Sequence, residues 1–343
     1  MEKPNKTACI KAVPGIYFPM ADLRVFCDAQ LDEGALKLLR EGIAPHELVL
    51  TARGAKSVLV QGPMDEAILE SDIALGQPSV ESVQKAARVR WLQVTSAGFT
   101  RYDTPEFRAA TKARGLIVTN SSAVYAEACA EHVFAFMLAQ ARRLPLALKA
   151  RGVAGSAAWM EVRKTSSCLR GQEVVILGFG TIAERLVEML TPFEMKITAM
   201  RRHPRGHENV ATVTPENLAA ALSTADHVVD ILPDNADSIR FVTKDRLGQM
   251  KRGAIFYNIG RGTTVDQSAL VESLHAGHLA AAWLDVTDPE PLPEGHPLLN
   301  APNCFMTPHV AGGHLNEGET LVRHFLENFQ RFVRNEPLDN RVM

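Results

Sequence analysis

The sequence has few cysteines, and none lies near another. The five, Cys9, Cys27, Cys129, Cys168 and Cys304, are odd in number and include no Cys-X-X-Cys pair. A disulfide framework or a cysteine-based zinc site is therefore not expected, and no metal is predicted. Scattered free cysteines are typical of proteins in a reducing compartment, so we expect a cytoplasmic protein.

Long apolar runs and an excess of charge are absent as well. No stretch reaches the roughly 18 apolar residues of a membrane span, and residues 1–15 lack the apolar core of a signal peptide. The 37 Lys and Arg nearly balance the 39 Asp and Glu, for a net charge of -2. This balance gives no electrostatic reason to expect nucleic acid or a membrane as partner, so a small-molecule ligand is favoured.

The chain is long enough for two domains, since it has 343 residues of which 46% are hydrophobic. From residue 174 onward, short apolar runs alternate with amphipathic stretches such as residues 265–276. Six strands with crossover helices predict a parallel sheet covered on both faces. The runs are VVILGF, KITAMR, HVVDILP, AIFYNIG, LAAAWLDV and CFMTPHV.

The N-terminal part predicts a second, smaller α/β unit. Its candidate strands are Glu47–Leu50, Ser57–Val60, Ile73–Leu75, Trp91–Thr95 and Leu116–Val118. Residues 127–143 have helical apolar spacing and predict one long helix that joins the two units.

The chain after the sixth strand is too short for a further domain, at about 36 residues. It contains an amphipathic stretch, residues 321–333, which we expect to pack back onto the first unit. The sequence thus predicts an α/β protein with two Rossmann-like domains. A dinucleotide-binding domain, 120–307, is inserted into a discontinuous substrate domain, 1–119 plus 308–343.

A glycine-containing turn follows the first of the six apolar runs. Gly178, Gly180 and Ala183 lie between the strand VVIL and a helical stretch. In this setting such a turn lets the backbone approach a pyrophosphate, and the third position accepts alanine. A Gly-X-Gly pair alone also fits a purely structural turn, but the flanking strand and helix favour a nucleotide. The predicted contacts are Gly178, Phe179, Gly180, Thr181 and Ile182.

Three stretches with chemically useful side chains end three consecutive strands. FYNIGRGTTVD carries Arg261, LDVTDPEPLP carries Asp285, Asp288 and Glu290, and MTPHVAGG carries His309. Each alone fits an ordinary exposed side chain. Because the carboxyl ends of parallel strands share one edge of a sheet, together they predict a carboxylate clamp, an acid and an imidazole in one site.

The second strand ends on two arginines instead of an acid. Arg201 lies 23 residues after Gly178, where NAD-binding units place a carboxylate on the ribose. Arg201 and Arg202 would suit a 2′-phosphate, so we predict NADP(H), with NAD(H) as the other candidate. The alternative is that both are solvated loop residues. For an exposed phosphate site we expect about 10- to 100-fold discrimination.

As a set, these motifs resemble the D-isomer-specific 2-hydroxyacid dehydrogenase family over nearly the whole chain. The matching stretches are GFGTIA, NIGRG with VDQSAL, LDVTDPEPLP, TPHVAGG, SAGFTRYD and AEHVFAFMLA. The resemblance implies a cofactor domain inserted into a substrate domain, an active site in the cleft between them, and a homodimer.

The resemblance also implies the roles of individual residues. His309 is the acid/base, Glu290 its partner and Arg261 the substrate clamp, with the amides of Ala97 and Gly98 opposite that clamp. A carboxylate beside the imidazole would favour its charged form. The remaining implied cofactor contacts are Leu232, Pro233, Ser238, Ile259 and Asp285.

The expected substrate is a small unphosphorylated 2-oxo acid, reduced to the D-2-hydroxy acid. LDVTDPEPLP is most similar to reductases of glyoxylate or hydroxypyruvate. An alternative is a phosphoglycerate dehydrogenase-type enzyme, but the stretch LGQPS, residues 75–79, lacks the cation that a phosphorylated substrate would need. A second alternative is a non-catalytic, NAD(P)-sensing protein similar to the corepressors of this family.

Overall fold

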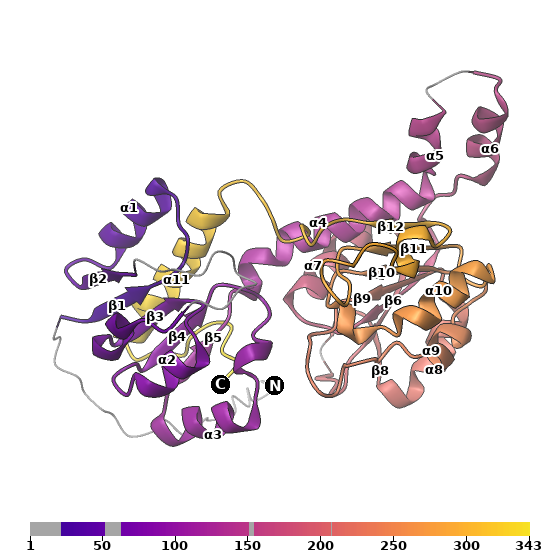
Figure 1. Cartoon of the computed structure of the whole chain (residues 1–343). Coiled ribbons are helices and arrows are strands. Elements are labelled where there is room, and N and C mark those ends of the chain that lie inside the picture. The colour runs from indigo at the N-terminus through magenta and orange to yellow at the C-terminus, as the bar shows by residue number, and fades with distance from the viewer. Residues whose placement is uncertain (1–21, 52–62, 151–153, 207) are drawn as a thin grey trace, which may run out of the picture.

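The computed structural model describes residues 22–51, 63–150, 154–206 and 208–343. They form two α/β units, each built on a parallel sheet (Figure 1). The predicted strand Ser57–Val60 lies outside the described residues. The fold class predicted from the sequence is confirmed.

The first sheet has the strand order β2-β1-β3-β4-β5, with every pairing parallel. Four of the strands were predicted. The fifth, β1 (RVFC), was missed. The elements of this unit are β1 (Arg24–Cys27), α1 (Glu33–Gly42), β2 (Glu47–Leu50), β3 (Ile73–Gly76), α2 (Val80–Lys85), β4 (Trp91–Val94), α3 (Pro105–Arg114) and β5 (Ile117–Thr119).

The second sheet has seven strands in the order β12-β11-β10-β9-β6-β7-β8, so the prediction of six strands was wrong by one. The additional β8 is a three-residue edge strand with partly exposed side chains, and so it leaves no apolar run in the sequence. The strands are β6 (Glu173–Leu177), β7 (Lys196–Met200), β8 (Ala211–Val213), β9 (His227–Asp230), β10 (Ile255–Asn258), β11 (Ala281–Leu284) and β12 (Cys304–Met306).

The helices of the second unit cover both faces of its sheet, as a parallel sheet requires. Separate apolar clusters fill the two faces. The helices are α7 (Thr181–Leu190), α8 (Leu218–Thr224), α9 (Lys244–Gln249) and α10 (Gln267–His275).

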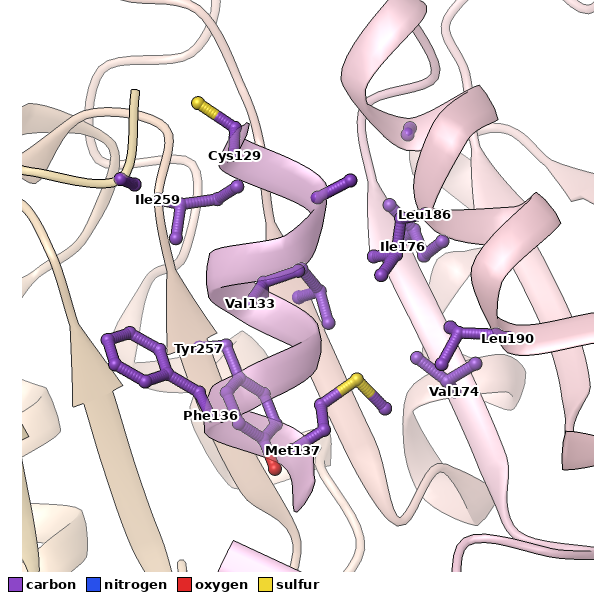
Figure 2. Packing of buried hydrophobic residues seen from close by; sticks show 14 of the residues in the cluster. Cys129, Val133, Phe136, Met137, Val174, Ile176, Leu186, Leu190, Tyr257 and Ile259 are labelled. Carbon is purple, nitrogen blue, oxygen red and sulfur yellow. The ribbon is translucent and has the colours of Figure 1, made fainter. Parts of the chain in front are cut away.

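The long helix α4 (Ser122–Ala141) runs from the first unit onto the second (Figure 1). It begins and ends a few residues earlier than the predicted 127–143. Val133 and Met137 on its buried face pack with Ile176 of β6 and with Leu186 and Leu190 of α7 (Figure 2). This shared core attaches the helix to the second unit.

The C-terminal helix α11 (Glu317–Val333) packs on the first unit, which confirms the predicted return of the chain. Its Phe325 and Phe329 belong to the core of the first sheet, and the Phe325 ring stacks on Trp91 at 5.0 Å between centroids. The chain end then lies beside β5, where the Val118 amide donates to the carbonyl of Met343.

Two short helices that were not predicted, α5 (Leu144–Lys149) and α6 (Ala157–Thr165), follow α4 and project from the body of the protein (Figure 1). Three of their large apolar side chains are exposed to solvent: Leu148 is 75% exposed, Leu144 42% and Met160 40%.

Of the helices that the structure describes, none combines the length and apolar character needed to cross a membrane. Within the same residues, no three His, Cys, Asp or Glu side chains gather where they could hold a metal ion.

Candidate functional site

Residues of both units line a cavity of about 490 Å³. It follows the carboxyl ends of β6, β9 and β10 on one side and the turns after β4 and β5 on the other. The second unit contributes Gly178–Ala183, Ile231–Asn235 and Ile259–Arg261, the first unit contributes Ala97–Thr100, Asp103 and Arg108, and the segment between β5 and α4 with the start of α4 contributes Asn120 and Ser122.

The glycine turn after β6 forms one wall of this cavity. Gly178 has φ +95°, a conformation that L side chains rarely adopt, and a Cβ there would lie 3.2 Å from the carbonyl oxygen of Ile231. Gly180 caps α7 without a side-chain hydrogen bond. The first amides of α7 therefore face the cavity wall without a side-chain acceptor, which suits a dinucleotide pyrophosphate.

The loop after β9 forms the adjoining wall. Leu232 and Pro233, which were predicted as cofactor contacts, both line the cavity. Ser238 is only 2% exposed. Its hydroxyl accepts from the Asn235 amide and bonds the Pro233 carbonyl, so in this structure Ser238 closes the loop. Its predicted cofactor contact stays a prediction.

Arg261 of the second unit meets the turn of the first unit that carries Ala97 and Gly98. A Cβ on Gly98 would lie 2.0 Å from Arg261 Nη2, so a side chain at this position would displace the guanidinium from its observed place. Arg261 Nη1 donates to the Gly260 carbonyl at 2.6 Å. Asn120 Nδ2 donates to the Ala97 carbonyl at 2.6 Å and holds the turn. The predicted clamp and the predicted turn are thus in contact.

Burial lowers the pKa of Arg261, whereas the carboxylates of Asp234 and Glu290 act in the opposite direction. Glu290 is therefore close enough to Arg261 to raise the pKa of its guanidinium.

His309 and Glu290 form the predicted pair, with His309 Nδ1 at 2.7 Å from Glu290 Oε1. The side chains are 21% and 34% exposed. His309 has φ +53°, a left-handed conformation that is uncommon outside glycine and frequent at functional sites. The described residues that line the cavity include Arg261 but neither member of this pair.

Asp285 holds the backbone of the loop that carries His309. The residue is 1% exposed. Its carboxylate accepts from the Thr307 hydroxyl at 2.5 Å and from the amides of Val310 and Ala311, both at 2.9 Å. The sequence grouped Asp285 with the cofactor contacts and did not predict this role. Its cofactor contact stays a prediction.

Arg201 and Arg202 each face an acid that sequence reasoning missed. Arg201 Nη1 lies 3.7 Å from Glu208, and Arg202 Nη1 lies 2.5 Å from Asp237. Backbone amides donate to Glu208, first that of Arg205, and lower the pKa of Glu208 to about 2. Asp237 comes from the loop after β9, which only the fold brings to Arg202, whereas Glu208 lies in the same β7–β8 loop as Arg201 and no motif marks it.

Further residues of the cavity were missed, among them Thr100, Asp103 and Arg108. Thr100 and Asp103 lie in the SAGFTRYD stretch, which the sequence marked as a motif without assigning chemistry to them, and Arg108 follows it. Thr100 Oγ1 donates to the Asp234 carbonyl of the other unit at 3.0 Å, and Arg108 forms an ion pair with Asp103.

Comparison with known families and proteins gives a consistent result. Residues 134–311 match the model of the D-isomer specific 2-hydroxyacid dehydrogenase, NAD binding domain. A glyoxylate reductase from Korarchaeum cryptofilum is 30% identical over 93% of this chain and 95% of its own length. A glyoxylate reductase/hydroxypyruvate reductase from Mus musculus is 31% identical over 75% of this chain and 77% of its own.

Solved structures share the architecture. An NADPH-dependent glyoxylate/hydroxypyruvate reductase from Sinorhizobium meliloti, in complex with NADP and malonate, superposes with a TM-score of 0.71. It is 25% identical, and the match covers 94% of this chain and 97% of that protein.

Proposed function

The chain belongs to the D-isomer-specific 2-hydroxyacid dehydrogenase family, and from that premise we propose that it reduces a small unphosphorylated 2-oxo acid to the D-2-hydroxy acid. Glyoxylate and hydroxypyruvate, the substrates named for its relatives, are the proposed type. The observation that supports this most is the contact of Arg261 with Gly98, beside the His309–Glu290 pair.

In this proposal the substrate carboxylate binds between the Arg261 guanidinium and the amides of Ala97 and Gly98. An arginine fork suits a carboxylate because it can form two parallel hydrogen bonds. A bound nicotinamide supplies the hydride for the carbonyl carbon. The chain's own task is then to place the carbonyl and to deliver a proton to its oxygen.

His309 is the proposed proton donor. Its Nδ1 faces Glu290, which leaves Nε2 for the substrate oxygen. Glu290 orients the ring through its contact with Nδ1. Asp285 acts through the backbone: it accepts from the amides that follow His309 and so holds the loop that carries this residue.

We propose NADP(H) as the preferred cofactor. The glycine turn from Gly178 to Ile182 fits the pyrophosphate, while Leu232, Pro233 and Ile259 line the same cavity. Arg201 and Arg202 would receive a 2′-phosphate. The NADPH dependence of the Sinorhizobium meliloti reductase supports this choice.

We also propose the division into a substrate domain, 1–119 plus 308–343, and a cofactor domain, 120–307. Two features support it: α11 packs on the first sheet, and α4 packs on α7 of the second unit.

The proposed reaction can be tested by assaying a panel of 2-oxo acids with NADPH and NADH, with 3-phosphoglycerate and NAD(P) in the reverse direction. We expect glyoxylate or hydroxypyruvate to be reduced with the highest kcat/KM. Preference for 3-phosphoglycerate would replace the proposed substrate class, and cofactor binding without turnover of any acid would favour the sensing alternative.

Replacing His309 with alanine should lower kcat by about 100-fold or more, the lower range for a lost general acid. The Kd for the cofactor should change little, because the imidazole is not among the residues lining the cofactor cavity. Steady-state kinetics and fluorescence titration measure the two quantities. His275→Ala, at an exposed position of α10, is the control. Near-normal turnover in His309→Ala would remove this residue from the mechanism.

Replacing Arg201 with aspartate should invert the cofactor preference. The new carboxylate would accept from the ribose hydroxyl of NADH and repel the additional phosphate of NADPH. We expect a wild-type preference for NADPH of about 10- to 100-fold in kcat/KM and its reversal in the variant. Arg252→Asp, an exposed change of equal charge, is the control. A wild type that uses NADH equally well would contradict the assignment.

We propose that the protein is a homodimer and that the projecting α5–α6 pair carries the contact, since Leu148 is 75% exposed there. Leu148→Glu should then give a species near the 37.5 kDa mass of one chain, and the wild type should give twice that mass in light scattering. Leu299→Glu, at another exposed leucine, should stay dimeric. An unaffected dimer in Leu148→Glu would place the interface elsewhere.

A further inference from the structure

A buried carboxyl group that the proposed reaction does not use lies at the end of β9. Asp230 is 0% exposed, and the ion pairs found among the described residues do not include it. An ionised carboxylate in such a place is costly unless enough donors surround it. The contacts of Asp230 therefore decide which form the group takes.

Asp230 joins the two loops that build the site. Its Oδ1 accepts from the amide of Leu232, in the loop after β9, at 2.9 Å. Its Oδ2 lies 2.6 Å from the hydroxyl of Thr264, three residues after the Arg261 clamp. The two loops are packed backbone to backbone, since a Cβ on Gly260 would lie 2.6 Å from the Leu232 carbonyl oxygen.

The Thr264 hydroxyl has two close oxygen neighbours but only one hydrogen. Its Oγ1 lies 2.6 Å from Asp230 Oδ2 and 2.6 Å from the Arg261 carbonyl oxygen. A carbonyl only accepts, and an ionised carboxylate only accepts as well. If Asp230 were ionised, one of these two short contacts would have no hydrogen between its oxygen atoms, and the two oxygens would repel each other.

A neutral Asp230 removes this conflict. Its own O–H donates to Thr264 Oγ1, the Thr264 hydrogen goes to the Arg261 carbonyl, and Oδ1 still accepts from Leu232. Asn258 Nδ2, also buried, donates to the same Arg261 carbonyl at 2.9 Å and leaves the chain of donors intact. Every polar atom of the group is then satisfied.

We propose that Asp230 is held as a neutral carboxylic acid whose proton completes a donor chain from Asp230 through Thr264 to Arg261, and that this chain positions the substrate clamp. The role of the clamp rests on the proposed function. Asp230 itself is a positioning residue, because its contacts are to the two loops.

The surroundings of Asp230 agree with a neutral acid. Burial raises the pKa of Asp230 to about 7, against the lowering effect of its bonds to Thr264 and Leu232. Its partners on the adjacent strands, Leu177 and Asn258, are uncharged. The titratable groups on the packed elements are Asp226, His227, Tyr257, Asp234, Arg261, Asp266, Lys244 and Glu272, each bonded to another partner.

The direction of the pH effect follows from the raised pKa. The folded protein keeps the proton of Asp230 up to about pH 7, whereas the unfolded chain loses it near pH 4. The stabilising contribution is therefore complete below about pH 4 and is lost as pH rises to about 7. Above that pH the folded protein ionises as well, and the donor chain to Arg261 is broken.

The kinetic test compares the wild type with Asp230→Asn and Asp230→Ala. An asparagine amide can donate to Thr264 and cannot ionise, so it reproduces the neutral acid at every pH. From about pH 6 to 8.5 we expect KM for glyoxylate to rise roughly 3- to 10-fold more in the wild type than in Asp230→Asn. Asp230→Ala should have a raised KM over this whole pH range, whereas Asp230→Asn should keep KM near the low-pH value of the wild type.

A measurement without substrate or cofactor separates this inference from the proposed function. Between about pH 5 and 7, the unfolding equilibrium constant of the wild type should rise by up to about tenfold per pH unit more than that of Asp230→Asn. Urea unfolding of the apoprotein measures this difference. Asp245→Asn, at an exposed position of α9, should follow the wild type.

Equal pH dependence of unfolding in the wild type and Asp230→Asn would overturn the neutral acid. A difference in unfolding with identical KM profiles would confirm the proton and overturn its link to the clamp. If no 2-oxo acid is reduced at all, the proposed function fails, while the unfolding experiment still decides the protonation state of Asp230.

Discussion

The contact between Arg261 and Gly98 is the constraint on which the site depends. It joins a strand end of one unit to a turn of the other, and it leaves no room for a Cβ at Gly98 while the guanidinium keeps this position, since that Cβ would lie 2.0 Å from it. The arginine is held from its own side as well. Asn258 and Thr264 donate to its carbonyl, while its guanidinium donates to Gly260. A long flexible side chain is thus given one position, which a clamp for a carboxylate needs.

Two buried acids organise the loops behind this contact, and the number of their donors distinguishes them. Asp285 accepts from one hydroxyl and two amides. Asp230 has one amide and one hydroxyl whose hydrogen is also required by the Arg261 carbonyl. The last residue of β9 and the first residue after β11 are therefore buried acids with different sets of donors: Asp230 contacts the loop that carries Arg261, and Asp285 holds the loop that carries His309.

Sequence reasoning predicted the features that are local. Apolar runs such as those of β6 and β10 are visible because buried parallel strands need them, and the edge that collects Arg261, Glu290 and His309 follows from the strand direction alone. It missed β8, a partly exposed three-residue edge strand. Asp230 and Asp237 were also missed, because Thr264 and Arg202, which they contact, lie in other loops that only the tertiary fold brings close. Glu208 lies in the same loop as Arg201 and was missed because no motif marks it.

The acids beside Arg201 and Arg202 bear on how such a site can hold a phosphate. Glu208 is stabilised first by the amide of Arg205 and also by that of Gly206, and Arg201, which lies 3.7 Å away, makes a smaller contribution than either to its lowered pKa. Arg202 is held closer to its acid, at 2.5 Å from Asp237. A phosphate that approaches the pair therefore competes with a contact of 3.7 Å at Arg201 and with one of 2.5 Å at Arg202. The Arg202–Asp237 pair is more than half exposed, so solvent screens it despite the short distance. Each guanidinium can therefore turn to a new anion from a contact that is either long or screened.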